Sequence, residues 1–154
     1  MVKYVKGDLF KAPVDIIAHG CNCIGGFGSG VAGQMAKKYP IVKEYYQHVH
    51  ETKGWVLGDV QFVALPANYD PKDYLLFVAN CATQQAYFPR NVVHADYPAI
   101  RTCMEKVKEF AIKNDLSIAI PKIGAGLAGG DWNTIEAIVS DVFSDYNILV
   151  CTLE

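Results

Sequence analysis

The sequence predicts an α/β fold in which helices cover both faces of a mixed β-sheet. Three observations favour this class. Several apolar segments are continuous rather than alternating, as strands buried on both faces are. Segments with helical spacing of apolar residues alternate with these strands. The chain has 154 residues, 51% of them hydrophobic and 19% charged, which suits one domain, residues 1–154, with a sizeable buried core.

The N-terminal half contains four predicted strands and two predicted helices. The strands are residues 2–6, Val14–His19, Val60–Pro66 and Tyr74–Asn80. The helices are Gly30–Lys38 and a segment from Pro40 to about Lys53. The hexamer NYDPKD at residues 68–73 is rich in turn-forming residues and predicts a turn between the last two strands.

The C-terminal half continues the alternation. Apolar residues at helical spacing predict a helix over Tyr97–Lys113, with Asn114 as its C-cap. A short buried strand is expected at Ser117–Pro121 and a closing strand at Ile148–Leu153. Between them lies a helix over Asp131–Phe143, for which Asp131 is the expected N-cap.

Composition and charge exclude several function classes. The net charge is -2, and the basic residues are scattered, so no basic face for duplex nucleic acid is expected. The sequence lacks an apolar run of roughly 20 residues and a signal peptide, so no membrane partner and a cytoplasmic location are predicted. The five cysteines predict free thiols, and the spacing of Cys21 and Cys23 does not suit zinc. We expect a monomer without a metal or a cofactor.

Two loops with the spacing G-x-G-x-x-G lie between a predicted strand and a predicted helix, at Gly28–Gly33 and Gly124–Gly129. Backbone amides and the helix dipole favour phosphate at such junctions. A dinucleotide fingerprint also needs an acidic residue at the end of the next strand, and Glu51 lies in a helical segment instead. The pair of loops therefore predicts a clamp for one pyrophosphate. The structural alternative is that these glycines only form tight turns and helix caps.

Four segments carry a resemblance to a known family. They are Gly7-Asp8-Leu9-Phe10, DIIAHGCN ending at Asn22, GFGSGVAGQMAKKYP and IPKIGAGLAGGDW. In order and spacing they resemble a macrodomain, the family that binds ADP-ribose, and within it the branch of ADP-ribose-1''-phosphate phosphatases. The resemblance implies a three-layer α/β/α fold with an ADP-ribose cleft at the strand ends.

The resemblance also implies roles for individual residues. Asp8 would accept a hydrogen bond from the adenine amine beside the Leu9 backbone, and Asn22 would bind the distal ribose and place a water. His19 and Asp131 would be the acid–base pair. The residues implied at the diphosphate and its sugars are Gly28, Ser29, Gly30, Val31, Gly124, Ala125, Gly126, Leu127 and Ala128. Each polar residue also has a structural alternative: a buried histidine, a helix cap at Asp131 and a turn residue at Asp8.

The expected activity is release of phosphate from ADP-ribose-1''-phosphate by a metal-independent hydrolase. One alternative is a non-catalytic ADP-ribose reader. Another is a hydrolase that removes ADP-ribose from protein or nucleic acid, or acetyl from O-acetyl-ADP-ribose. The related terminal glycohydrolases carry a lysine near the Asn80–Gln84 segment, whereas this sequence has none between Lys72 and Lys106. Arg90 could reach a phosphate.

Overall fold

The computed structural model describes residues 1–67 and 74–153, so the turn predicted at residues 68–73 lies outside the described residues. Six strands form one sheet in the order β1-β6-β5-β2-β4-β3. The strands are β1 (Val2–Lys6), β2 (Ile16–Asn22), β3 (Val60–Leu65), β4 (Leu76–Gln84), β5 (Ile118–Ile120) and β6 (Ile148–Thr152). The helices are α1 (Gly30–Lys38), α2 (Pro40–Thr52), α3 (Tyr97–Asn114) and α4 (Trp132–Val142), and η1 (Leu9–Lys11) is a 3-10 turn.

The sheet is mixed, as predicted. Strand β3 pairs antiparallel with β4, and the other neighbouring strands pair in parallel. Strand β2 lies between β4 and β5, and all three point the same way. Their carboxyl ends therefore open onto one edge of the sheet, where ligands bind in folds of this class.

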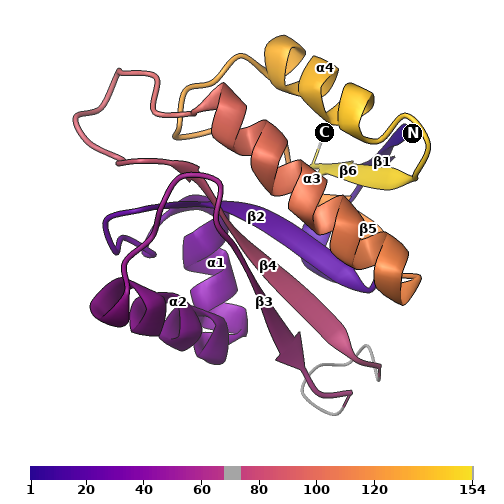
Figure 1. Cartoon of the computed structure of the whole chain (residues 1–154), viewed down its shortest axis with the longest axis horizontal. Helices are drawn as coiled ribbons and strands as arrows, with labels where there is room; N and C mark the ends of the chain where they lie inside the picture. The colour runs from indigo at the N-terminus through magenta and orange to yellow at the C-terminus, as the bar shows by residue number, and fades with distance from the viewer. Residues whose placement is uncertain (68–73, 154) are drawn as a thin grey trace.

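Helices cover both faces of the sheet, which confirms the predicted three-layer arrangement (Figure 1). One core cluster joins the sheet to α1 and α2 through residues such as Ile17, Met35 and Tyr46. The other joins the opposite face to α3 and α4 through residues such as Ile16, Ile100 and Val139. Ile16 and Ile17 belong to different clusters because successive side chains of a strand point to opposite faces.

The structure differs from the predicted bounds mainly at the ends of two central strands. Strand β2 continues past His19 to Asn22, and β4 continues past Asn80 to Gln84. The extension is a parallel ladder in which His19 pairs with Asn80 and Asn22 with Gln84. Backbone pairing thus places polar residues in the buried part of the sheet. A search for apolar segments does not predict such strand ends. Helix α3 also ends one residue later than predicted, with left-handed Asp115 as the C-cap in place of Asn114.

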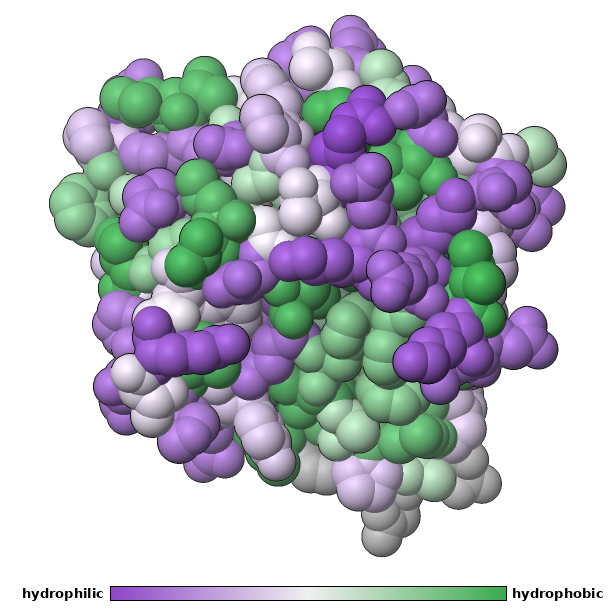
Figure 2. Space-filling model, in the orientation of Figure 1, coloured by the Kyte–Doolittle hydropathy of each residue, from purple (hydrophilic) through white to green (hydrophobic). Residues whose placement is uncertain are grey.

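The face beyond α3 carries apolar side chains from the outer strands. Figure 2 shows a green area there, between α3 and the grey residues. Phe110 of α3 stacks on Phe62 of β3 with ring centroids 3.9 Å apart and meets the edge of Phe77 from β4. This aromatic cluster packs α3 against the antiparallel edge of the sheet. Among the described residues, no helix is long and apolar enough to cross a membrane.

Candidate ligand-binding site

A cavity of about 980 Å³ lies at the carboxyl ends of β2, β4 and β5. Three chain segments form its walls: the first glycine loop, taken as residues 23–30, the second glycine loop, taken as residues 121–130, and the segment between β4 and α3. The lining residues include Gly20, Cys21, Asn22, Gly26, Gly28, Ser29, Gly30, Val31, Ala32, Gln84, Tyr87, Arg90, Asn91, Val92, Val93, Pro121, Lys122, Ile123, Gly124, Gly126, Leu127, Ala128 and Gly129. The predicted clamp residues of both loops are thus brought to one cavity, except Ala125.

Asn22, the last residue of β2, organises the first glycine loop. Its side-chain Oδ1 accepts hydrogen bonds from the amides of Ile24 and Gly26, both at 3.0 Å. Its Nδ2 donates to the carbonyl oxygen of Gly26 at 2.7 Å. Since an asparagine amide has two N–H groups, one of them is left for a ligand. Asn22 therefore combines a predicted ligand contact with a structural role that the sequence did not indicate.

Tyr46 of α2 also binds the backbone of this loop. Its hydroxyl donates to the carbonyl oxygen of Asn22 at 2.7 Å and accepts from the Gly25 amide at 3.1 Å. The ring is fully buried and stacks on Trp55, whose indole N–H donates to the Tyr46 carbonyl at 3.1 Å. Burial raises the pKa of the Tyr46 hydroxyl, so this group stays neutral and remains a donor.

The first loop ends in a helix N-terminus without a side-chain cap. Ser29 is the N-cap residue of α1, yet its side chain makes no capping hydrogen bond. The first bond of the helical pattern runs from the Gly33 amide to the Ser29 carbonyl at 3.1 Å. The amides of Gly30, Val31 and Ala32 thus have no acceptor within the helix, and all three residues line the cavity. Together with the helix dipole, they can bind an anion.

The second glycine loop is folded on its own backbone. The Gly130 amide donates to the carbonyl of Gly124 at 2.8 Å, and the Gly129 amide donates to that of Gly126 at 3.0 Å. Leu127, 71% exposed at the tip, reaches across the cavity, since a Cβ on Gly30 would lie 3.6 Å from its Cδ1 atom. The two loops therefore meet over the ends of the strands.

The segment between β4 and α3 forms the third wall and contacts both loops. The Tyr87 ring covers Gly26 of the first loop so closely that a Cβ there would lie 2.4 Å from the ring. The amides of His94 and Ala95 donate to the carbonyl of Ala128 in the second loop at 2.7 and 3.2 Å. Figure 1 places this segment at the upper left, where Figure 2 shows green, hydrophobic residues.

The charged groups of the cavity are of one sign. Arg90 and Lys122 line it, and no aspartate, glutamate or histidine of the described residues does so. Both cations are exposed to solvent. An anion bound by the amides of the glycine loops would therefore lie in a positive field without a competing carboxylate.

His19 lies beneath the cavity and is fully buried. Its Nε2 donates to the Oδ1 atom of Asn80 at 2.5 Å, and its ring meets the edge of Phe27 at 5.6 Å between centroids. Its Nδ1 finds no hydrogen-bond partner among the described residues. Burial lowers the pKa of His19 to about 4, opposed by the contact with Asn80, so the ring is neutral at pH 7.

Asp131 and Asp8, two further predicted polar residues, also lie outside the cavity lining. Asp131 is exposed and caps α4, accepting from the amide of Thr134 at 3.1 Å and from its hydroxyl at 2.7 Å. These bonds lower the pKa of the Asp131 carboxyl. Asp8 accepts from the Phe10 amide at 2.9 Å and caps η1, while Leu9 is buried in the core. The predicted cap at Asp131 is confirmed. The catalytic and adenine roles of these residues stay predictions.

The cysteines behave as packing residues. All five are free and buried. Cys21 lies at the cavity floor with only 3% of its surface exposed, and burial raises the pKa of its thiol. A thiol with a raised pKa is a poor nucleophile at neutral pH.

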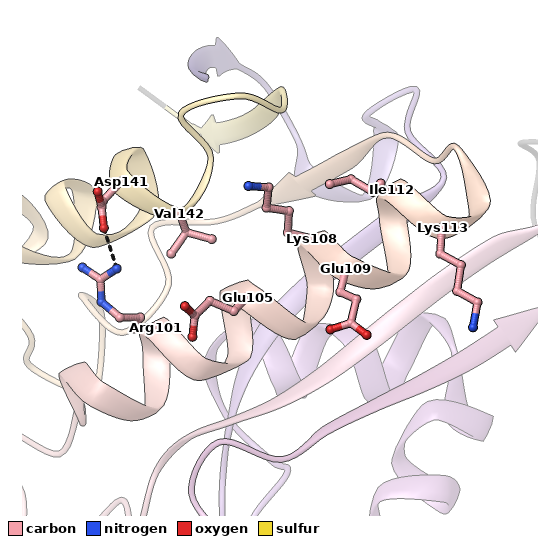
Figure 3. Close-up of a pocket in the computed structure, with 8 residues that line it drawn as sticks. All are labelled: Arg101, Glu105, Lys108, Glu109, Ile112, Lys113, Asp141 and Val142. Carbon is pink, nitrogen blue, oxygen red and sulfur yellow. Dashed lines mark hydrogen bonds and ion pairs between the residues drawn. The ribbon is translucent and has the colours of Figure 1, made fainter.

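A second hollow, of about 600 Å³, lies on the outer surface of α3 and α4 (Figure 3). It is lined by exposed side chains of both signs, and Arg101 pairs with Asp141 across it at 2.6 Å. Since its cations are matched by carboxylates from the same two helices, this hollow lacks the one-sided charge of the cavity. It also lies away from the glycine loops.

Several residues of the site were missed from the sequence. Tyr46 and Gln47 contact the loop from a helix that begins ten residues after the loop ends, and Gln47 donates to the Gly25 carbonyl at 2.8 Å. At Tyr46 and Gln47, the sequence indicated a helix but gave no sign of a contact with the loop. Lys122 had a better one, because it stands inside the glycine-loop segment IPKIGAG.

Comparisons with known proteins agree with this architecture. Residues 18–139 match the family model of the Macro domain. An uncharacterised 17.5 kDa protein of Enterobacteria phage T4 is 35% identical, over 100% of this chain and 97% of its own length. The ADP-ribose 1''-phosphate phosphatase of the yeast Lodderomyces elongisporus is 28% identical, over 97% of this chain and 98% of the relative.

Solved structures share the fold over nearly all of the chain. A protein of unknown function from Bacteroides thetaiotaomicron superposes with a TM-score of 0.84 at 31% identity, covering 98% of this chain and 97% of that one. The family match spans most of the chain and includes most of β2, all of β4 and β5, and both glycine loops. The chain therefore belongs to the macrodomain family.

Proposed function

We propose that this chain binds ADP-ribose in the cavity and hydrolyses ADP-ribose 1''-phosphate to ADP-ribose and phosphate. The observation that carries the proposal is the pair of glycine loops on one cavity. One presents the free amides of an uncapped helix, and the other presents a tight backbone turn. Such amides match the oxygens of a diphosphate. The name of the yeast relative supports the choice of reaction.

The binding roles follow from the positions of the residues. The diphosphate would lie between Gly28–Val31 and Gly124–Ala128, with the distal ribose beside the remaining N–H group of Asn22. The predicted adenine contact at Asp8 would lie beyond this cavity. Hydrolysis breaks the bond between the phosphorus and the 1'' oxygen, a water adds to the phosphorus, and the 1'' oxygen takes a proton.

The acid–base assignment changes in view of the geometry. Neither His19 nor Asp131 lines the cavity, and His19 is neutral, buried and engaged with Asn80. We propose that the chain mainly orients the substrate and neutralises its charge, while an oxygen of the substrate phosphate accepts the proton of the attacking water. In this mechanism, His19 and Asp131 take no part in proton transfer and contribute only by holding β2 and α4 in position. Turnover therefore depends on Asn22 more than on these two residues.

The decisive experiment is a substrate panel with the whole chain. ADP-ribose 1''-phosphate, O-acetyl-ADP-ribose and an ADP-ribosylated peptide are incubated separately, and phosphate, acetate and free ADP-ribose are measured. We expect phosphate from the first substrate at rates well above those for the other two. Binding of ADP-ribose by calorimetry without any product would instead identify a non-catalytic reader.

A second experiment addresses the catalytic residues. The double variant His19→Gln with Asp131→Asn keeps a hydrogen-bonding group at both positions. We expect it to retain most of the phosphate release, whereas Asn22→Ala loses most of it. Loss of turnover in the double variant, with ADP-ribose affinity unchanged, would return the acid–base role to His19 and Asp131.

A further inference from the structure

Arg90 is a cation at the cavity wall without a protein partner. It lines the cavity and is exposed, and no hydrogen bond or ion pair joins its side chain to another of the described residues. Arg101, by contrast, is held by Asp141 at 2.6 Å. An unpaired guanidinium beside an anion site keeps its full charge and its donors available to a ligand.

The segment that carries Arg90 makes contacts on both sides of this residue. The His94 ring donates from Nε2 to the Pro89 carbonyl oxygen at 2.7 Å, which closes the chain around Arg90. On one side Tyr87 packs on Gly26, and on the other the amide of His94 binds the Ala128 carbonyl. Arg90 is therefore positioned relative to both glycine loops.

Arg90 belongs to the cavity wall that contacts the end of β2, because Tyr87, three residues earlier, lies against Gly26, whose carbonyl accepts from the Asn22 side chain. Its segment follows β4 directly, and Gln84 at the end of β4 pairs with Asn22. Under the proposed function, the distal ribose and its 1'' substituent lie at this end. The glycine loops already supply amides for the diphosphate, which leaves Arg90 available for the 1'' substituent, the position where substrates differ from one another.

We propose that Arg90 determines specificity for substrates that carry a phosphoryl group at the distal ribose in addition to the diphosphate. A guanidinium binds a phosphate monoester through two parallel hydrogen bonds, and a neutral acetyl group offers no such match. This inference rests on the proposed function. It adds a residue that separates ADP-ribose 1''-phosphate from ADP-ribose and from its acyl esters.

The test compares Arg90→Gln with Arg101→Gln, which removes the same charge from the outer surface of α3. Phosphate release from ADP-ribose 1''-phosphate gives kcat/KM, and calorimetry gives the Kd for ADP-ribose. For Arg90→Gln we expect kcat/KM to fall by about 10- to 100-fold, as for loss of a charge-assisted bidentate contact, with a change in the ADP-ribose Kd of less than about threefold. Arg101→Gln should leave both unchanged.

Two results would overturn the inference. Equal losses of kcat/KM and of ADP-ribose affinity would assign Arg90 to the diphosphate, and no loss of either would give it no role in recognition. If the natural chain releases no phosphate, the proposed function fails on its own. In that case, the ratio of Kd values for ADP-ribose 1''-phosphate and ADP-ribose, measured with and without Arg90→Gln, still decides the role of Arg90.

Discussion

The two glycine loops have the same spacing of glycines but are held in place by different means. The first is supported by side chains: Asn22 from β2 and Tyr46 from α2 bind its backbone. The second is supported by its own backbone, through hydrogen bonds from Gly129 and Gly130 back to Gly126 and Gly124. The side-chain bonds of the first loop fall on residues 24–26, just before its glycine pattern, whereas the backbone bonds of the second loop begin and end at the glycines of its pattern and at Gly130.

The difference in support teaches where each loop is sensitive to change. A loop folded on its own backbone has little room for an added side chain at its crossing points. The glycine pattern of the first loop is also tight, since a Cβ on Gly33 would lie 2.9 Å from the Gly28 carbonyl oxygen, but residues 24–26 before it respond in addition to changes in the side chains that hold them. The predictions below test this division, beginning with the largest expected effect on stability.

The second loop should not tolerate a methyl group at Gly130. A Cβ at this position would lie 2.6 Å from the carbonyl oxygen of Gly124 and 2.9 Å from the Cβ of Ala95. Because the first of these neighbours is backbone, the loop itself must move. We expect Gly130→Ala to lower the free energy of unfolding by about 3 kcal/mol, measured by urea titration.

Gly126→Ala provides the matched control in the same loop. A Cβ on Gly126 meets no atom within 4 Å, so its stability should stay within about 0.5 kcal/mol of the natural chain. Comparable losses in both variants would show that the loop is sensitive to any side chain rather than to the backbone crossing at Gly130.

The free energy of unfolding should depend on pH through His19, which lies on β2 just before the first loop. The unfolded chain binds a proton on this ring with a pKa near 6.5, and the folded chain with a pKa of about 4. The unfolded state thus binds more protons between these values, and stability falls as the pH decreases. The full contribution is present above pH 6.5. From pH 7 to pH 5, we expect His19 to account for a loss of about 2 kcal/mol.

Urea titrations of the natural chain and of His19→Gln at pH 7, 6 and 5 check this prediction. The variant has no group that titrates at this position, so its stability should change less over the range. Parallel profiles for the two proteins would mean that the ring is protonated in the folded state or reached by solvent.

Tyr46→Phe should weaken the first loop while leaving the core packed. The phenylalanine ring can keep the contacts with Phe27 and Trp55, but the bonds to Asn22 and Gly25 are lost. We expect a loss of about 1–2 kcal/mol in stability, because buried polar groups are left without partners. The ADP-ribose Kd, measured by calorimetry, should increase by about tenfold.

Tyr45→Phe is the neighbouring control, since Tyr45 is 48% exposed on the same helix. Tyr45→Phe should alter neither the free energy of unfolding nor the ADP-ribose Kd. An unchanged ADP-ribose Kd in Tyr46→Phe would contradict the view that α2 holds the first loop in its binding conformation.

Much of the fold could be predicted because local patterns determine it. The helices and the three-layer arrangement around a mixed sheet follow from apolar periodicity and from strands that alternate with helices, whereas the order of the strands was not predicted. The ends of β2 and β4 were predicted too early because Asn22, Asn80 and Thr83 are polar yet buried. What buries them is pairing with a strand about 60 residues away, which local patterning does not include.

The candidate site was predictable where backbone geometry suffices and less so where a side chain must point in one direction. Glycine spacing at two junctions located the cavity. The direction of His19 depends on strand parity: it shares its face with Ile17 and Cys21, which belong to the α1–α2 core. A shift by one residue would reverse that direction. Support from Tyr46 depends on how α2 packs, which is a tertiary property.

The smallest expected effect concerns the N-termini of α1 and α4, the helices that follow the two glycine loops. Asp131 caps α4, and hydrogen bonds from Thr134 lower the pKa of its carboxyl, so the capping contribution is present above pH 4 and is lost as the pH falls further. At pH 7 we expect Asp131→Ala to lower Tm by about 2 °C. Ser29→Ala at α1 should leave Tm unchanged, because Ser29 makes no capping bond. Thermal unfolding followed by circular dichroism measures both. Equal losses of Tm would mean that α1 is capped by its side chain after all, and its amides would then be less available to a phosphate.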